Sequence, residues 1–176
     1  MYKILIALLL ITIPSVVMAE PITKLTARNY YDNCKNKSDP NITPITQKLL
    51  CACTAVQLFK NMSVGDVDSM ALQNQAGRLA LNKMIIDVYA PCMKHPAKEL
   101  YYQNCITNPE TQNLTKNPEK TCSCMSSNIA SYLSTRGVDV FQKILRENPN
   151  ITDPMAALSN DKTFQKFTQT QLMGCL

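Results

Sequence analysis

The sequence predicts an all-α protein, stapled by disulfide bonds and built from two tandem repeats of about 70–80 residues. Three observations predict this fold. Glycine is scarce, with 4 among 176 residues, which leaves few positions for hairpin turns, nucleotide-binding loops or β-bulges. Cysteine is frequent and even in number, with 8 residues that recur at matching spacings. No segment alternates apolar and polar residues for long enough to indicate a β-strand.

The overall composition is that of a chain that folds, because 45% of the residues are hydrophobic and only 18% are charged. There is one histidine and no tryptophan, and a single histidine excludes most His-dependent catalytic and zinc-site designs. The 18 basic and 13 acidic residues give a net charge of +5, but they are interspersed along the chain. Without a basic run or face, we expect no nucleic-acid binding.

Residues 1–19 have the pattern of a secretory signal peptide. A single positive charge at Lys3 precedes an apolar run from Ile4 to Ile13, and the small residues Val17 and Ala19 suit a cleavage site after Ala19. A membrane anchor is the alternative, but the run is too short to cross about 30 Å of hydrocarbon. We therefore expect an exported protein, periplasmic or extracellular, with no transmembrane segment after cleavage. The brevity of the signal is typical of bacteria.

The strongest feature is an internal repeat at an offset of 71 residues. The segment Tyr30–Cys34 (YYDNC) recurs as Tyr101–Cys105 (YYQNC), and Cys51-Ala52-Cys53 recurs as Cys122-Ser123-Cys124. Nine positions are identical between 30–68 and 101–139. Each half ends with one further cysteine, Cys92 or Cys175. The chain is therefore predicted to contain two four-cysteine units, 20–96 and 97–176, packed as one compact body.

Periodicity and capping signals place the helices. The first helix carries Ala27 and Cys34 on one face, and Thr43-Pro44 and Asn117-Pro118 each read as an N-cap followed by proline. They predict helices over 44–62 and 118–135. A third helix follows Asp66 and is broken near Gly77. A fourth contains 81–92, and its copy contains 164–175, after a loop at 148–154. His95, the lone histidine, falls in the linker between the units.

An export signal favours disulfides over free thiols, so we expect four bonds, two in each unit. Residues i and i+2 of a helix point about 200° apart, so Cys51 and Cys53 should face different neighbours. Because Cys51 lies on the more apolar stripe, we predict the pairs Cys51–Cys92 and Cys34–Cys53, with Cys122–Cys175 and Cys105–Cys124 in the second unit. The swapped pairing, Cys34–Cys51 with Cys53–Cys92, remains open.

A Cys-x-Cys sequence has other uses, as a soft-metal ligand or as a redox pair. Tetrahedral zinc sites draw two ligands from each of two short knuckles, whereas the first and last cysteines of each set stand alone. No residue near the Cys-x-Cys pairs is an obvious thiol activator. We therefore expect no metal site and no cofactor, and a thiol-redox or soft-metal protein is kept only as an alternative.

Paired tyrosines are the most specific feature apart from the cysteines. Tyr30 and Tyr31 recur as Tyr101 and Tyr102, one turn before the first cysteine of each set. We expect one tyrosine of each pair to pack near the disulfide and its neighbour to border solvent, where the four residues are candidates for recognition.

The scaffold is repeated, but no catalytic constellation is. His95 has no counterpart in the second half, and there is no Gly-x-Ser-x-Gly motif. The sequence therefore predicts no catalytic residues and a non-enzymatic, exported binding or interaction protein. Its ligand is an unidentified protein. A carrier of a lipid or another apolar small molecule is the alternative.

Overall fold

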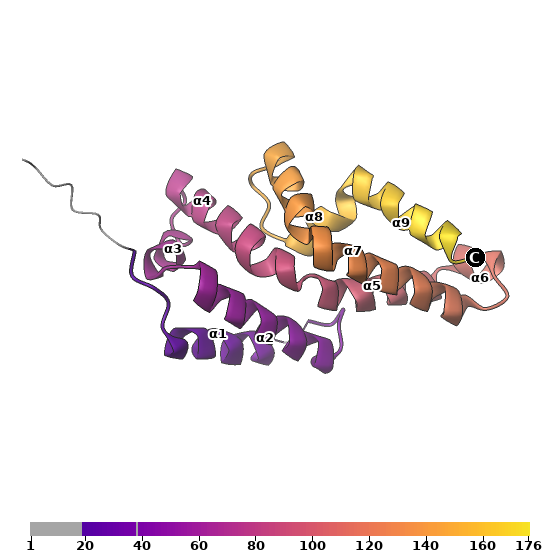
Figure 1. Cartoon of the computed structure of the whole chain (residues 1–176), viewed down its shortest axis with the longest axis horizontal. Coiled ribbons are helices and arrows are strands. Elements are labelled where there is room, and N and C mark those ends of the chain that lie inside the picture. The colour runs from indigo at the N-terminus through magenta and orange to yellow at the C-terminus, as the bar shows by residue number, and fades with distance from the viewer. Residues whose placement is uncertain (1–18, 38) are drawn as a thin grey trace, which may run out of the picture.

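The computed structural model describes residues 19–37 and 39–176, and within them the chain forms nine α-helices and no strand (Figure 1). The all-α, disulfide-stapled fold predicted from the sequence is therefore confirmed. The predicted signal peptide, 1–19, lies outside the described residues apart from Ala19.

The first two helices form an antiparallel hairpin. Helix α1 spans Lys24–Asn36 and α2 spans Pro44–Asn61. Thr43 caps α2 as predicted, because its side chain accepts a hydrogen bond from the Thr46 amide at 3.3 Å and Pro44 occupies the first helical position. This hairpin makes up the lower layer in Figure 1.

A short helix, α3 (Val64–Ser69), and α4 (Gln75–Met84) follow the hairpin. The chain continues without a break through a π-helical turn, η1 (Ile85–Tyr89), and a 3₁₀ turn, η2 (Ala90–Cys92). The predicted break near Gly77 is wrong in position, because Gly77 lies in the first turn of α4. A Cβ atom at Gly77 would lie 1.8 Å from the carbonyl oxygen of Leu72, so glycine lets α4 start directly against the preceding turn.

Helix α5 spans Lys94–Thr107 and passes through the predicted boundary between 96 and 97 without interruption. His95 therefore lies in the first turn of a helix rather than in a linker. A six-residue helix, α6 (Pro109–Leu114), leads to α7 (Pro118–Glu147). The predicted cap of α7 is confirmed, because the Asn117 side chain accepts from the Lys120 amide at 3.1 Å.

Helix α7 runs to Glu147, well past the end at 135 that the repeat predicted. The first half breaks after α2 because Ser63 and Asp66 form a capping box, in which each side chain accepts from the other residue's backbone amide. The corresponding residues at an offset of 71 are Ser134 and Gly137. Without the carboxylate the box cannot form, and the helix continues.

Gly137 also lets α7 pass close to η2, because a Cβ atom there would lie 2.8 Å from the carbonyl oxygen of Ala90. Beyond α7, a loop at 148–153 leads to α8 (Pro154–Asn160) and α9 (Lys162–Gly174). Helices α8 and α9 pack against α7 and lie on the opposite side of the molecule from the α1–α2 hairpin in Figure 1.

The apolar interior has two clusters. The larger one joins α5, α7 and α9 with residues of the first half, among them Ile85, Ala90 and Met93. The smaller one joins α1, α2, α4 and η1. Tyr89 packs against both clusters, and its hydroxyl accepts from that of Tyr30 at 3.3 Å. Burial raises the pKa of Tyr89, and the neighbouring Tyr30 raises it further. The two halves therefore share packing across their junction.

All four disulfides form within the predicted units, but the pairing predicted inside each unit is wrong. The bonds are Cys34–Cys51, Cys53–Cys92, Cys105–Cys122 and Cys124–Cys175, in place of Cys34–Cys53, Cys51–Cys92, Cys105–Cys124 and Cys122–Cys175. As expected, the two cysteines of each Cys-x-Cys face different neighbours.

The error concerns which neighbour each cysteine meets. The sequence prediction packs the apolar stripe of α2 that contains Cys51 against the last helix of the unit, which carries Cys92. The seven-residue connection instead folds α1 back onto that stripe. Cys51 is fully buried there, and its Cα lies 5.6 Å from that of Cys34. Cys53 then points to the other side of α2, where it meets Cys92 in η2.

Candidate interaction surfaces

The four tyrosines singled out from the sequence lie on two helices, Tyr30 and Tyr31 on α1 and Tyr101 and Tyr102 on α5. Tyr30 packs against the smaller apolar cluster, and Tyr101 against the larger one, with its ring edge-on to Phe164 at a centroid distance of 5.8 Å. Burial raises the pKa of Tyr101. Tyr31 and Tyr102 each line a surface hollow between two helices. All four are partly buried, and Tyr30 also lines a separate open hollow of about 540 Å³ together with Cys34, Gln47 and Tyr89.

The hollow at Tyr31, here called the first hollow, lies between α1 and α2 and is almost wholly apolar. Its α1 side is formed by Lys24, Ala27, Arg28 and Tyr31. Its α2 side is formed by Ala52, Ala55, Val56 and Phe59. Its volume is about 450 Å³. The three alanines supply no long side chain to fill the space between the helices, and this leaves the depression open.

The first hollow continues into an exposed apolar seam along α2. Val56 and Phe59 are 50% and 41% exposed, and towards the start of α2 Leu49 and Ile45 are 48% and 72% exposed. With Ala52, these side chains recur at alternating intervals of four and three residues, the spacing by which one helix packs along another. Sequence reasoning missed this seam because it assigned a single apolar stripe to α2, the one that contains Cys51.

Cations border the seam, and none of them forms a salt bridge with the described residues, although Arg28 is near enough to Asp32 to help Lys35 lower the pKa of that carboxyl. These cations are Lys24 and Arg28 on α1 and Lys48 and Lys60 on α2. Helix α2 contains no aspartate or glutamate. The one acidic residue of α1, Asp32, is paired with Lys35 at 2.6 Å, which lowers the pKa of Asp32. Lys35 also lies over the Tyr31 ring, 5.0 Å from its centroid. The face is therefore apolar along its centre and positive at its edges.

The hollow at Tyr102, here called the second hollow, lies between α5 and α7 and is more polar. Its lining from these helices includes Lys94, His95, Lys98, Glu99, Tyr102, Ser123 and Ser126. Thr46 and Leu49 of α2 complete it, so a helix of the first half lies against it. Glu99 holds that helix by its N-terminus, since its carboxylate accepts from the Thr43 amide at 2.6 Å and from the Thr43 hydroxyl at 3.0 Å.

His95 lines the second hollow without a hydrogen-bond partner or ion-pair partner among the described residues. Burial lowers the pKa of His95, and the adjacent Lys94 lowers it further. The buried Ser126 donates to the backbone carbonyl of Ser123 at 3.2 Å rather than to the imidazole. The arrangement has neither a base hydrogen-bonded to a nucleophile nor an acid that orients the base.

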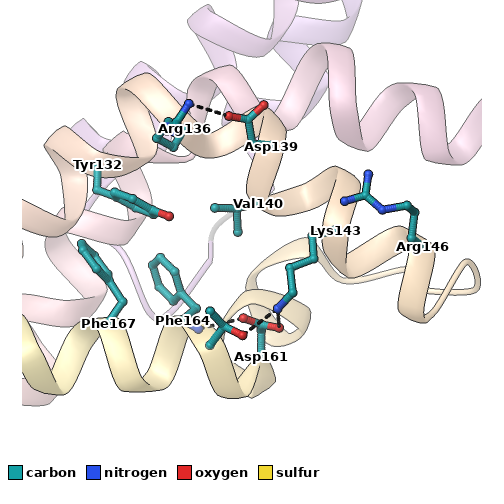
Figure 2. A pocket seen from close by; sticks show the side chains of 10 residues that line it. Tyr132, Arg136, Asp139, Val140, Lys143, Arg146, Asp161, Phe164 and Phe167 are labelled. Carbon is teal, nitrogen blue, oxygen red and sulfur yellow. Dashed lines mark hydrogen bonds and ion pairs between the residues drawn. The ribbon is translucent and has the colours of Figure 1, made fainter.

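A third surface feature is a cleft between α7 and α9, shown in Figure 2. One side is aromatic, where Tyr132 stacks on Phe167 at a centroid distance of 4.1 Å and both rings flank the buried Phe164. These contacts attach α9 to α7. The aromatic side is therefore accounted for by packing within the chain.

The opposite side of the cleft is charged, and most of its charges are paired. Arg136 lies 3.1 Å from Asp139. Lys143 lies 3.3 Å from Asp161 and 2.6 Å from the Thr163 hydroxyl. Asp161 also caps α9 by accepting from the Phe164 amide at 2.7 Å. Arg146 alone has no ion pair with the described residues. The charged side thus holds the start of α9 in place, and less of it is available to a ligand than its composition suggests.

The eight cysteines are all in disulfides, which leaves no thiol for nucleophilic or metal chemistry in this oxidised form. Within residues 19–37 and 39–176, no group of three or more His, Cys, Asp and Glu side chains is placed to hold a metal ion. Four disulfides indicate an oxidising environment rather than the cytoplasm.

No helix in the described part of the chain is long and apolar enough to cross a bilayer. No protein-family model, no curated protein and no solved structure matches the chain.

Proposed function

We propose that the chain is an exported, non-enzymatic binding protein whose contact surface is the α1–α2 face, composed of the first hollow and the seam of α2. The observation that carries this proposal is the seam itself. Four large apolar side chains along it, Ile45, Leu49, Val56 and Phe59, are each at least 41% exposed. Contiguous exposed apolar surface with a polar rim is characteristic of interaction sites in soluble proteins.

Export to the periplasm or the extracellular space is part of the same proposal. It rests on the signal-peptide pattern of residues 1–19 and on the four disulfides. A function without catalysis is favoured by the surroundings of the lone histidine. His95 lacks the neighbours that a general base requires, and the charges of the α7–α9 cleft are mostly paired with each other.

The experiment is capture of partners by the purified, oxidised chain from an envelope or host extract, repeated with two variants. Val56→Glu places a charge in the seam, and Leu79→Glu makes the same kind of change at an apolar residue of α4 that is 62% exposed. We expect a partner that is retained by the wild type and by Leu79→Glu and is lost with Val56→Glu. Absence of any partner at micromolar concentration, or equal capture by all three proteins, would contradict the proposal.

A carrier of an apolar small molecule is the second candidate, and the first hollow favours it specifically. Its wall is apolar except for Lys24 and Arg28 at the rim, which resembles the lining of many ligand sites. Native mass spectrometry of the purified protein tests this function. A bound lipid-sized mass that Val56→Glu removes would support a carrier, and a protein that is always ligand-free would exclude it.

A further inference from the structure

We propose that the partner presents an acidic amphipathic helix, whose apolar side packs along the seam of α2 and whose carboxylates meet the cations at its edges. This inference rests on the proposed function, since it names the partner of the same surface. Two observations carry it: a helix of the same chain, α2, packs beside the second hollow and lines it, and unpaired cations surround the first hollow.

The two hollows occupy the same place in the 71-residue register. Lys24, Ala27, Arg28 and Tyr31 correspond to His95, Lys98, Glu99 and Tyr102. Ala52 and Ala55 correspond to Ser123 and Ser126. The second hollow is lined in addition by Thr46 and Leu49 of α2. A neighbouring helix of the chain therefore packs at the edge of the second hollow, whereas no described helix other than α1 and α2 lines the first hollow.

One substitution between the hollows reverses the charge that such a helix would meet. In the second hollow, Glu99 accepts hydrogen bonds at the N-terminus of α2, where the helix dipole is positive. The corresponding residue in the first hollow is Arg28, which can only donate. A guanidinium there favours carboxylate side chains or the negative, C-terminal end of a helix.

The other charged residues at the edges of the seam are also positive. Lys48 and Lys60 lie at the two edges of the seam, and neither has an acidic partner among the described residues. The small side chains of Ala52 and Ala55 leave a depression beside the seam that can receive one apolar side chain of a packed helix. The geometry thus suits a single helix with an apolar seam and acidic flanks.

A second copy of this chain is a poor occupant. In the second hollow, Thr46 and Leu49 near the start of α2 face the lining residues. If a second copy packed on the first hollow in the same way, it would do so with the corresponding residues near the start of its α7. Those residues are Asn117 and Lys120, and Lys116 lies beside them. Lysines of one copy would then meet Lys24 and Arg28 of another, and this repulsion disfavours the contact.

The probes for the test are three synthetic helical peptides with one apolar seam at alternating four- and three-residue spacing. The seam is flanked by glutamate, glutamine or lysine, and binding to the full oxidised chain is measured by fluorescence anisotropy. Partly exposed charge pairs contribute little individually. We therefore expect the glutamate peptide to bind about tenfold more tightly than the lysine peptide at low salt, with the difference largely lost at 1 M salt.

Matched variants locate the effect. Arg28→Glu should reduce the preference for the glutamate peptide, because only Lys24, Lys48 and Lys60 then remain, whereas Arg78→Glu, at an exposed residue of α4, should leave it unchanged. Val56→Glu should weaken all three peptides at least tenfold, and Leu79→Glu should weaken none. Circular dichroism and free-thiol titration of each variant establish that the fold and the four disulfides are intact.

The alternatives give different results. Equal affinity for all three peptides would overturn the acidic helix and leave the proposed binding function standing. Capture of an extract protein that depends on Val56, without binding of any peptide, would overturn the helix in the same way. Binding to phosphatidylglycerol vesicles that depends on Val56, again without peptide binding, would replace the helix with a membrane surface. Loss of both peptide binding and Val56-dependent capture would overturn the inference and the proposed function together.

Discussion

The long helices α2 and α7 occupy corresponding places after the first connection of each half, yet their outward faces differ. Along α2 the seam reads Ile45, Leu49, Ala52, Val56 and Phe59. At the same register the second half has Lys116, which precedes α7, and then Lys120, Ser123, Ser127 and Ala130 within α7. Both helices nevertheless carry the same pair of disulfide attachments, with Cα–Cα distances of 5.6 Å for Cys34–Cys51 and for Cys105–Cys122.

The comparison shows that the stapled scaffold does not require an apolar outer face. Serine and lysine serve at these positions in the second half, and the disulfide connectivity is unchanged. The exposed apolar surface in the first half therefore needs an explanation other than stability, because side chains that stay 41–72% exposed add only part of their burial free energy to folding. A binding partner of the α1–α2 face provides that explanation.

The largest expected effect concerns the feature that the halves share. Replacing Cys34 and Cys51, or Cys105 and Cys122, by alanine removes a bond that closes a loop of 17 residues in both cases. In the chain-entropy model each removal costs about 3 kcal/mol, and removing Cys124–Cys175, with a separation of 51 residues, costs about 4 kcal/mol. Urea unfolding of the three variants measures these costs. A large inequality between the two 17-residue loops would show that the halves are not equivalent scaffolds.

Two glycine-to-alanine substitutions, one in each half, should have opposite effects on the free energy of unfolding. Gly137→Ala places a Cβ atom 2.8 Å from the carbonyl oxygen of Ala90, and we expect a loss of about 1–3 kcal/mol in the free energy of unfolding. Gly65→Ala is the matched change in the first turn of α3, where the nearest atom is 3.9 Å away. It should stabilise by about 0.5 kcal/mol. Thermal unfolding compares them, and equal effects would contradict the close passage of α7 by η2.

The capping box explains why the first half breaks where the second continues. Asp66→Ala removes the side chain that accepts from the Ser63 amide at 2.9 Å, and should cost about 1 kcal/mol. The matched control is Asp68→Ala, since Asp68 is exposed and follows in the same short helix. Chemical denaturation should show a loss for Asp66→Ala only. Identical losses would leave the break between α2 and α3 unexplained.

The smallest expected effect on stability belongs to the seam. Val56→Ser installs the residue that α7 has at Ser127, and should change the free energy of unfolding by less than about 0.5 kcal/mol because Val56 is half exposed. The same variant should lose affinity for the partner. The reverse change, Ser127→Val, should create no binding in the second half. A loss above 2 kcal/mol for Val56→Ser would assign the seam a structural role instead.

Much of the fold follows from local sequence signals. Thr43-Pro44 and Asn117-Pro118 mark helix starts because capping and proline act within one turn. The cysteine spacing also predicted which four cysteines bond among themselves, because each set of four lies within one half of the chain.

Other features depend on contacts that no local pattern carries. The choice between Cys92 and Cys34 as the partner of Cys51 depended on which helix covers the apolar stripe of α2, and this is a matter of tertiary packing. The length of α7 depended on one missing carboxylate at Gly137. The seam was visible in the spacing of its apolar residues, but its exposure was not. That α2 packs beside the second hollow could not be predicted either, because Leu49 is far in sequence from the α5 and α7 residues that it meets there.

The most direct test of the central claim is a titration of the ¹⁵N-labelled, oxidised chain with the glutamate-flanked peptide, followed by two-dimensional NMR. We predict saturable shifts of the amides of Ala27, Arg28, Tyr31, Ala52 and Val56, with the amides of the α7–α9 cleft unchanged. Shifts confined to the α7–α9 cleft, or no saturable shift on α1 and α2, would contradict the assignment of the α1–α2 face as the binding surface.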